Sequence, residues 1–222
     1  MSGTNIDWWE RPRVIFIVVD NDSWILPYAD TLVEEINKRG DKAKLCRNHH
    51  EIQKGVVAFY MGCVKVTPRE ILDKNRYNVV VHESDLPIGR GFSPLIWQIL
   101  EGKNIIPVCL IEADDDVDAG CIYMKREIKL QGHELNHEIR HKQGQLTVEM
   151  CLDFLENSNP PVGIAQQGEP SIYCKRTPED SKLDINKSIA EQFNLLRVVD
   201  NDRYPAFFEK DGCRYTLKIE KA

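Results

Sequence analysis

A continuous run of β-branched and apolar residues near the start of the chain constrains the fold most. Residues Val14 to Val19 contain no polar side chain, and the run ends at Asp20. A strand that is apolar on both sides must be covered on both faces, as the central strands of parallel sheets are. We therefore expect residues 14–19 to form a central strand with Asp20 at its carboxyl end.

Helical and strand patterns alternate after this run. Between Pro27 and Arg39 apolar residues recur at helical spacing, and Gly40 follows where a helix C-cap belongs. Further strands are expected at residues 43–46, 56–60, 78–81 and 105–112, with short helices at residues 68–72 and 93–100. Such alternation predicts an α/β fold, a Rossmann-like parallel sheet that binds its ligands at the carboxyl ends of the strands.

The pattern changes in the second half of the chain. A strand is expected over residues 121–130. Helical patterning begins at about residue 134 and is interrupted at Gly144, and a second helix is expected over residues 147–156. Residues 157–170 are rich in turn-forming residues and are typical of a linker. We therefore divide the chain into a main domain, residues 1–158, and a linker with a small C-terminal subdomain, residues 159–222. This subdomain should contain a helix at 185–193 and a hairpin around Asp211-Gly212.

Composition excludes several classes of protein. The formal net charge is −6 over 222 residues, and the basic residues are dispersed, which disfavours a nucleic-acid partner. No basic leader and no stretch of 18 apolar residues occurs, so we expect a cytoplasmic protein without a membrane partner. The seven cysteines are scattered and odd in number, which indicates reduced thiols rather than a disulfide framework.

The residues best suited to catalysis lie at the ends of two expected strands. His82 directly follows the strand expected at 78–81, and a loop with Pro87 and two glycines leads from it into the next helix. The acidic segment Asp114 to Asp118 follows the strand expected at 105–112. Since the carboxyl ends of parallel strands meet at one edge of the sheet, we expect a histidine and a carboxylate to lie together there.

The segment from His82 to Gly91, followed by Pro94 and Trp97, resembles the His-x-Ser-x-Leu-Pro-x-x-x-Gly signature of the 10-formyltetrahydrofolate-dependent formyltransferases. Asp118-Ala-Gly resembles the family's Asp-x-Gly, at the family's spacing from the histidine. The resemblance implies that the main domain is a formyltransferase catalytic domain with 10-formyltetrahydrofolate as formyl donor.

The tail narrows the resemblance. The segments Arg176-Thr-Pro-Glu-Asp-Ser and Tyr204-Pro-Ala-Phe-Phe resemble the short C-terminal extension of the sugar N-formyltransferases, with the closest likeness to enzymes of pseudaminic-acid pathways. This likeness implies that the acceptor is the amine of a nucleotide-linked sugar, of a 4-amino-4,6-dideoxy type such as a UDP-linked one. The apolar residues of the tail need a surface to bury against, so we expect the tail to cover one end of the main domain or to join a homodimer.

Roles for individual residues follow from the same resemblance. An amine that attacks the formyl carbon creates a negative oxygen and a positive nitrogen, so the site must stabilise one and deprotonate the other. His82 is assigned to the oxygen, and Asp118 to orienting His82 and relaying the proton. The residues assigned to folate are Cys63, Val64, Lys65, Leu86, Asp114, Asp115 and Asp116. Those assigned to the acceptor are Asp20, Asn21, Trp24, Ser84 and Arg90.

One position departs from the family pattern. The family has an asparagine two residues before the histidine as a second oxyanion donor, and this chain has Val80 there. Asn78 lies about 13 Å behind His82 along the strand and cannot replace it. Ser84, Asn104 or a backbone amide are the open alternatives.

Three other functions compete with this interpretation. Methionyl-tRNA formylation would need a basic RNA-binding extension, and a non-catalytic formyltransferase-like binding module would explain Val80. His133-Glu-Leu-Asn-His137, extended by His141, fits a zinc hydrolase pattern, but we expect structural or solvated histidines and no metal. The loop from Asp20 to Trp24 contains no glycine to approach a phosphate closely, which argues against a glycinamide ribotide acceptor.

Overall fold

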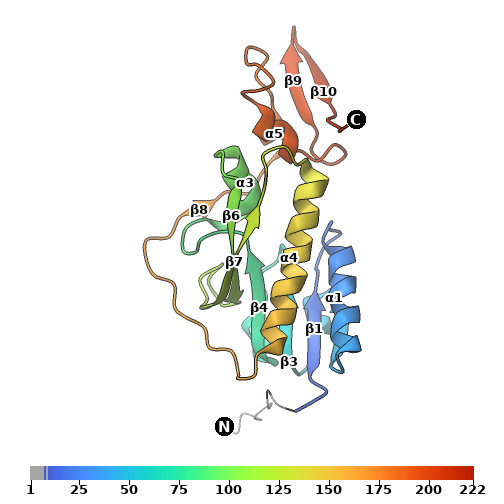
Figure 1. Ribbon diagram of the computed structural model, residues 1–222, viewed down its shortest axis with the longest axis vertical. Coiled ribbons are helices and arrows are strands. Elements are labelled where there is room, and N and C mark those ends of the chain that lie inside the picture. Colours follow the sequence, from blue (N-terminus) through green and yellow to red (C-terminus); the bar gives the residue numbers. More distant parts are fainter. Residues whose placement is uncertain (1–7, 9) are drawn as a thin grey trace.

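The helices and strands follow the predicted alternation closely. The computed structural model describes residue 8 and residues 10–222 (Figure 1). In chain order the elements are β1 (Val14–Val18), α1 (Leu26–Lys38), β2 (Lys42–Cys46), η1 (His49–Glu51), β3 (Gly55–Tyr60), α2 (Arg69–Leu72), β4 (Asn75–His82), β5 (Arg90–Gly91), α3 (Pro94–Leu100), β6 (Ile105–Glu112), β7 (Ile122–Lys129), α4 (Asn136–Glu156), β8 (Ile172–Tyr173), η2 (Pro178–Ser181), α5 (Phe193–Val198), β9 (Ala206–Lys210) and β10 (Cys213–Leu217).

A six-stranded sheet forms the centre of the molecule, in the order β2-β1-β3-β4-β6-β7. The first four strands in this order pair in parallel, and β1 lies between β2 and β3 as its apolar sequence predicts. Ile15 and Ile17 face a core shared with α1 and α4, whereas Phe16 and Val18 face a second core that includes residues of α2. The predicted α/β class is therefore confirmed, with a sheet that is mostly parallel.

Strand β6 departs from the predicted parallel arrangement. It pairs antiparallel with both β4 and β7, with Val79 opposite Glu112 and His82 opposite Cys109. After β4 the chain forms β5 and α3 beyond the carboxyl end of the sheet instead of returning across a face (Figure 1). The next strand therefore starts at that edge and runs backward. The expectation that the acidic loop leaves the sheet beside His82 is wrong, because β6 ends level with Val79.

Helix α4 is one continuous helix and not the two pieces that the sequence suggested around Gly144. Gly144 is buried where α4 crosses α1, and a β-carbon there would lie 2.6 Å from ring atoms of Tyr28. The glycine therefore serves close packing between helices and does not end the helix. Tyr28 also reaches His141 of α4 through its hydroxyl, at 2.9 Å from Nδ1.

The residues after α4 fold back onto the main domain (Figure 1). Ile164 forms a bridge to Ile122, and β8 pairs in parallel with β5. The chain then forms η2, α5 and the β9–β10 hairpin, which enclose a small core of their own. The predicted turn at the hairpin is confirmed, since Asp211 and Gly212 have φ angles of 50° and 78°.

The predicted helix at residues 185–193 is displaced. Residues 185–192 form turns, and α5 begins only at Phe193. Local side-chain bonds explain the shift: Asp184 accepts from the amide of Asn186, and Gln192 Nε2 donates to the carbonyls of Asp184 and Ser188. Such bonds offer the backbone an alternative to the helix.

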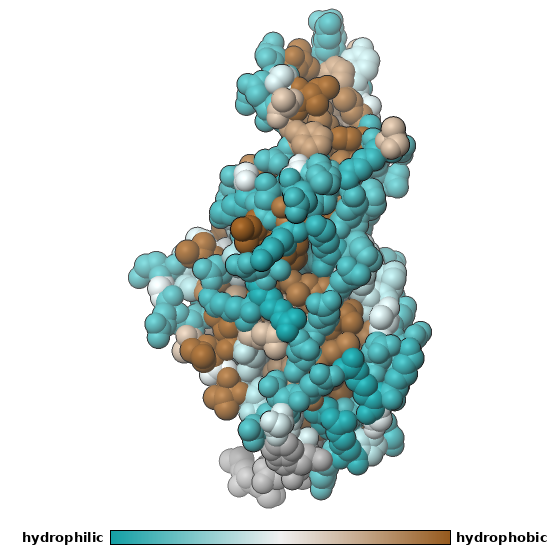
Figure 2. Space-filling model, viewed as in Figure 1, coloured by the Kyte–Doolittle hydropathy of each residue, from teal (hydrophilic) through white to brown (hydrophobic). Residues whose placement is uncertain are grey.

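On the face shown in Figure 2, hydrophobic residues gather at the hairpin end and along the flank where the linker runs. Tyr215 is half-exposed there. The homodimer expected from the sequence stays a prediction. Among the helices of residues 10–222, none combines the length and the apolar character required to cross a bilayer.

Substituting Gly144 with alanine tests the helix contact. An added methyl group should strain the packing against Tyr28 by about 1–3 kcal/mol, more than the gain of up to about 1 kcal/mol from helix propensity. Urea denaturation should therefore show Gly144→Ala to be destabilised. In a Tyr28→Ala background the same substitution should stabilise, and equal destabilisation in both backgrounds would contradict this packing.

Candidate active site

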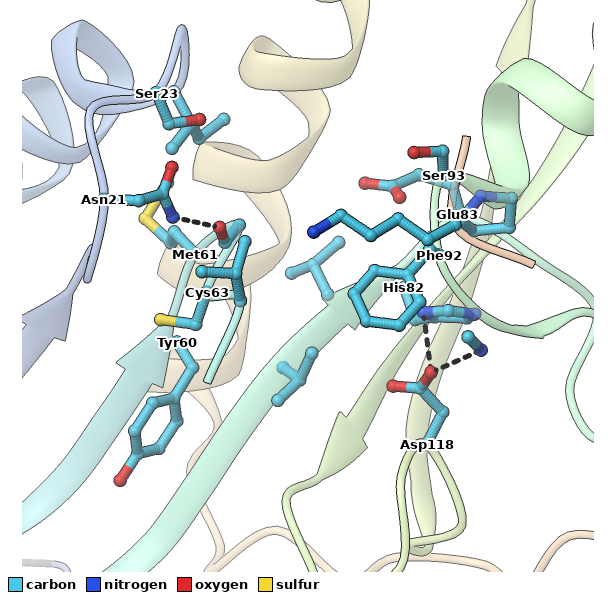
Figure 3. A pocket seen from close by; sticks show the side chains of 18 of the residues that line it. Asn21, Ser23, Tyr60, Met61, Cys63, His82, Glu83, Phe92, Ser93 and Asp118 are labelled. Atoms are coloured by element: carbon cyan, nitrogen blue, oxygen red, sulfur yellow. Dashed lines mark hydrogen bonds and ion pairs between the residues drawn. The ribbon is translucent and has the colours of Figure 1, made fainter. Parts of the chain in front are cut away.

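A cavity of about 780 Å³ opens at the carboxyl edge of β1, β3 and β4. One wall consists of the loop Asn21–Ile25 and the segment Tyr60–Thr67, and the opposite wall contains His82, Glu83 and Asp118 (Figure 3). The volume is that of a cavity for a small ligand, about 300–1,000 Å³.

His82 and Asp118 lie together, although β6 runs antiparallel to β4 and not parallel as the sequence predicted. Asp118 Oδ2 is 3.5 Å from His82 Nδ1, and the side chains are 13% and 6% exposed. The loop after β6 turns back toward the end of β4, with Asp118 itself in the left-handed region at φ 53°. Asp118 Oδ2 also accepts the amide hydrogen of Gly91 at 2.8 Å, which ties the loop to the segment that follows His82 (Figure 3).

Gly120 makes this loop conformation possible. A β-carbon at Gly120 would collide with the backbone carbonyl of Glu112 at the end of β6. Glu112 is half-buried, and its carboxyl accepts a hydrogen bond from Tyr123. The glycine of the Asp-x-Gly segment therefore lets the loop close tightly over the strand end, with Asp118 directed at His82.

The hydrogen bonds of His82 define which ring nitrogen can act. Nε2 lies 2.8 Å from the carbonyl oxygen of Gly89, and since a carbonyl can only accept, Nε2 carries a proton. Nδ1 is therefore the nitrogen that faces Asp118. His82 can donate from Nδ1 only as an imidazolium, and in its neutral form it presents a lone pair there.

Asp20 organises the opposite wall. Its carboxylate, 1% exposed, accepts hydrogen bonds from Asn21 Nδ2 and from the amides of Val64 and Lys65. His49 Nε2 lies 3.2 Å away. Burial alone would raise the pKa of Asp20, but these hydrogen bonds and the nearby His49 outweigh it and hold the pKa below its usual value. Asp20 thus acts as an anchor for the segment after β3.

Asp20, His49 and Cys63 are the one group within residues 8 and 10–222 whose ligand atoms lie close enough together for a metal ion. Their atoms are already satisfied without one. Asp20 accepts the bonds described above, His49 Nδ1 lies 3.1 Å from the Thr67 hydroxyl, and Cys63 donates to the carbonyl of Val18. Burial raises the pKa of the Cys63 thiol to about 12, so it is protonated at neutral pH.

The zinc-like histidine pattern does not lie on one helix. His133 precedes α4, which begins at Asn136, and the side chains of His133, His137 and His141 are all exposed. Glu134 is buried, and Lys142 with the amide of Gln131 holds its pKa at about 2, although burial alone would raise it. Its role is structural within this corner of the fold.

Part of the cavity wall comes from α4 and the tail. Arg140 of α4 forms an ion pair with Asp200 at 2.9 Å and lies 5.7 Å from the Trp24 ring. Lys175 lies 5.9 Å from the Phe92 ring, and no ion pair to it is found in the described part of the chain. The remaining lining residues from these two regions are Asn136, Gln143, Thr147, Arg176, Thr177, Val198, Arg203 and Tyr204.

The predicted site residues fall into two groups. Those that line the cavity are His82, Asp118, Asn21, Trp24, Cys63, Val64, Lys65 and Asp114. Those outside its lining are Asp20, Ser84, Leu86, Arg90, Asp115 and Asp116. Leu86 is buried in an apolar cluster, Arg90 donates to Gln166 of the linker, and Asp115 is exposed, 3.9 Å from Arg69. Ser84 is buried, and Asn104 accepts from Arg197 away from the cavity, so neither side chain replaces the oxyanion donor missing at Val80.

Sequence reasoning missed several cavity residues. Glu83 lies within the motif itself, at one of its variable positions, and Gln143 of α4 donates to it at 2.7 Å. The charge of Glu83, next to His82 in the motif, was the signal from which it could have been predicted. Arg140 and Lys175 carried no such signal, because only the folded chain brings α4 and the tail to the end of β4.

Curated relatives of the chain are methionyl-tRNA formyltransferases. The one from Rickettsia massiliae (strain Mtu5) is 32% identical over 125 residues, which cover 55% of this chain and 41% of the relative. The one from Francisella philomiragia is 30% identical over 127 residues, which cover 57% of this chain and 41% of the relative. The chain therefore spans less than half the length of these relatives. No protein-family model matches it.

Solved structures match over almost the whole chain. A methionyl-tRNA formyltransferase from Clostridium thermocellum superposes with a TM-score of 0.79 at 23% identity, covering 94% of this chain and 92% of that one. A likely sugar N-formyltransferase from Mycobacterium tuberculosis has a TM-score of 0.72 at 18% identity, with 95% and 100% covered. HypX from Aquifex aeolicus in complex with tetrahydrofolic acid has a TM-score of 0.72 at 16% identity, with 94% and 38% covered. The chain therefore has the formyltransferase fold.

The anchoring role of Asp20 can be tested without a ligand. Asp20→Asn replaces a hydrogen-bond acceptor with an amide group and should cost about 1–3 kcal/mol while speeding hydrogen exchange at Val64 and Lys65. Because the pKa of Asp20 is lowered in the folded state, the wild-type advantage should be present at neutral pH and disappear as pH falls below about 4. Asp22→Asn, at a fully exposed side chain, is the control. Unchanged exchange in Asp20→Asn would refute the anchor.

Proposed function

We propose that this protein transfers a formyl group from 10-formyltetrahydrofolate to the amine of a nucleotide-linked amino sugar, of a 4-amino-4,6-dideoxy type. The observation that carries the proposal is the contact between His82 and Asp118 at a cavity of about 780 Å³ in a formyltransferase fold. The homologues and structural neighbours named as formyltransferases support the reaction class.

The residues present suit a folate. Tyr60, Leu72, Val80 and Ile111 give part of the cavity an apolar lining, and the segment Met61–Thr67 is held by Asp20 beside them. A folate ring needs flat apolar surfaces with polar backbone groups at its edge. In this proposal Cys63, Val64 and Lys65 meet the folate from one side and Asp114 from the other, and the bound folate supplies the formyl group. The complex of HypX with tetrahydrofolic acid supports a folate ligand for this fold.

The acceptor's amine would attack the formyl carbon next to His82. His82 as an imidazolium would direct its Nδ1–H at the developing oxygen, and Asp118, whose Oδ2 lies 3.5 Å from that nitrogen, would counter the positive charge of the ring. Asp118 is itself held by the Gly91 amide, so the pair is fixed before substrate arrives. Val80 supplies no second donor, which leaves this oxygen with weaker stabilisation than a site that has an asparagine.

A phosphorylated acceptor fits the cationic side of the cavity. Arg140, Lys175 and Arg203 line it near the tail, together with the aromatic rings of Trp24 and Tyr204. Guanidinium and ammonium groups bind phosphate oxygens, and aromatic rings stack on a nucleotide base. These groups support an acceptor that joins a diphosphate to an amino sugar, with Asn21 and Trp24 on its path.

Formylation of methionyl-tRNA is the second candidate, because the curated relatives are named methionyl-tRNA formyltransferases. A solved structure of that name also matches 94% of this chain. The net charge of −6 disfavours a nucleic-acid acceptor.

The two acceptors can be compared directly. Purified protein should be incubated with 10-formyltetrahydrofolate and either UDP- and dTDP-linked 4-amino-4,6-dideoxyhexoses or methionyl-tRNA, with formylated product followed by mass spectrometry. Product from the sugars alone is expected. Product from the tRNA alone would replace the proposal, and product from neither would favour a binding module.

His82 and Asp118 should both be required for turnover. His82→Ala removes the oxyanion donor, and Asp118→Asn removes the charge that supports it, so each should lower kcat by at least about 10²-fold. Both side chains are largely buried, so circular dichroism should accompany the rates to show that the fold is intact. Near-normal turnover in a folded variant would refute the role of that residue.

Restoring the family's asparagine tests the missing donor. Val80→Asn should leave kcat unchanged or raise it, because an amide at this position would add a hydrogen bond to the oxyanion. Val80→Ala serves as the control for the change in packing alone. A clear loss of activity in Val80→Asn, with Val80→Ala unaffected, would mean that the donor is already provided elsewhere and that the amide disturbs it.

A further inference from the structure

Glu83 is a carboxylate at the cavity that the formyltransferase signature does not assign. It directly follows His82, and Gln98 Nε2 donates to its backbone carbonyl at 2.6 Å, which fixes the main chain. Gln143 Nε2 donates to Oε1 at 2.7 Å. Within residues 8 and 10–222, no other side chain donates a hydrogen bond to this carboxyl group. Gln143 thus orients the carboxyl group from α4, and the backbone amide of Glu83 bonds to it as well.

We infer that Glu83 is the catalytic base that takes the proton from the attacking amine in the proposed formyl transfer. The inference rests on the proposed function and adds a residue to it. Glu83 lines the cavity beside His82, and in Figure 3 its carboxyl group lies on the side of the His82 ring opposite Asp118. The His82 ring therefore has a carboxylate on each side. In the proposed reaction, an amine that attacks a formyl group held by His82 lies beside both.

Asp118 is less suited to the proton transfer than Glu83. Its Oδ2 accepts from the Gly91 amide and lies 3.5 Å from His82 Nδ1, so protonation there would loosen both the loop and the ring. Glu83 accepts from Gln143 and from its own backbone amide, so protonating it would not release the loop that carries Asp118. The two carboxylates thus divide the work: Asp118 maintains the charge next to His82, and Glu83 exchanges a proton.

The surroundings of Glu83 favour a proton on it at higher pH than on an ordinary glutamate. Removal from water raises its pKa, and Asp118 raises it further, whereas His82 and the hydrogen bond from Gln143 lower it, with a net increase. The charged side chains from α4 and the tail that line the cavity are Arg140, Lys175, Arg176, Asp200 and Arg203. A base with a raised pKa is well matched to catalysis near neutrality.

The proton balance is complete without any further reactant. The amine nitrogen forms a bond to the formyl carbon and becomes a positively charged ammonium, which must lose a proton before the amide can form. Glu83 takes that proton. As the bond from carbon to the folate nitrogen breaks, the electron pair stays on that nitrogen, which receives the proton back from Glu83. The products are a formamide and tetrahydrofolate, and Glu83 is regenerated.

Ionisation of Glu83 can be measured without turnover. Protein labelled with ¹³C at the glutamate carboxyl carbons should show one resonance that is absent in Glu83→Gln and that titrates above the ordinary glutamate value of about 4.3. In Gln143→Leu the same resonance should titrate at a still higher pH, because the hydrogen bond that favours the ionised form is lost. A midpoint at the ordinary value would overturn the inference whatever the reaction.

Kinetics then test the role of the proton. With an acceptor that wild-type protein formylates, Glu83→Gln should lower kcat by about 10²–10⁴-fold and remove the decline of kcat at low pH, with the KM for folate changed less than about threefold. Glu83→Ala should regain activity when acetate is added, since acetate can occupy the space and accept the proton. The matched control is Asp85→Asn, because Asp85 is an exposed carboxylate two residues away that pairs with Lys125 on the surface.

The outcomes separate this inference from the proposed function. Turnover by wild type with near-normal kcat in Glu83→Gln would overturn the base and leave the proposed function standing. A loss in Glu83→Gln without acetate rescue in Glu83→Ala and with the low-pH decline retained would make Glu83 structural. No turnover by wild type with any acceptor would overturn the proposed function and the base together.

Discussion

The reversed direction of β6 is the constraint on which the candidate site depends. Because β6 runs against β4, its end lies level with Val79, and the loop that follows has to travel back toward the end of β4. Gly120 and the left-handed backbone of Asp118 allow this return, and the Gly91 amide fixes it. A parallel β6 would deliver its loop at the sheet edge with no need for that fold-back. The contact between His82 and Asp118 is therefore a product of strand direction and loop geometry together.

Three carboxylates around one cavity have different duties because their surroundings differ. Asp20 is saturated by amide and side-chain donors, which lower its pKa and make it a permanent anion that shapes a wall. Asp118 shares its charge between a backbone amide and His82. Glu83 has a single side-chain donor and a raised pKa. Chemically similar groups around one cavity thus differ in how firmly their charge is held, and the proton exchange proposed for Glu83 depends on that difference.

Much of the fold could be predicted from local patterns, and part of the site could not. The apolar run of β1, the helical spacing of α1 and the Asp211-Gly212 turn are encoded within short windows, and the structure confirms them. Gly144 was misjudged because its partner, Tyr28, is more than a hundred residues away. The helix expected at residues 185–193 was displaced by side-chain bonds that hydrophobic spacing does not report. His82 and Asp118 were found through motif spacing, although the topology assumed for them was wrong, and the contribution of the tail to the cavity has no local signature at all.

The path of the chain after α4 has a consequence for how the protein is made. Residues 175–177 and 198–204 complete a cavity whose other wall lies between residues 21 and 118. Synthesis proceeds from the N-terminus at about 5–20 residues per second, and early segments fold while later ones are still being added. A nascent chain would therefore possess the sheet, His82 and Asp118 for several seconds before the tail docks. During that time the pocket is open to water on the side that residues 175–177 and 198–204 later cover.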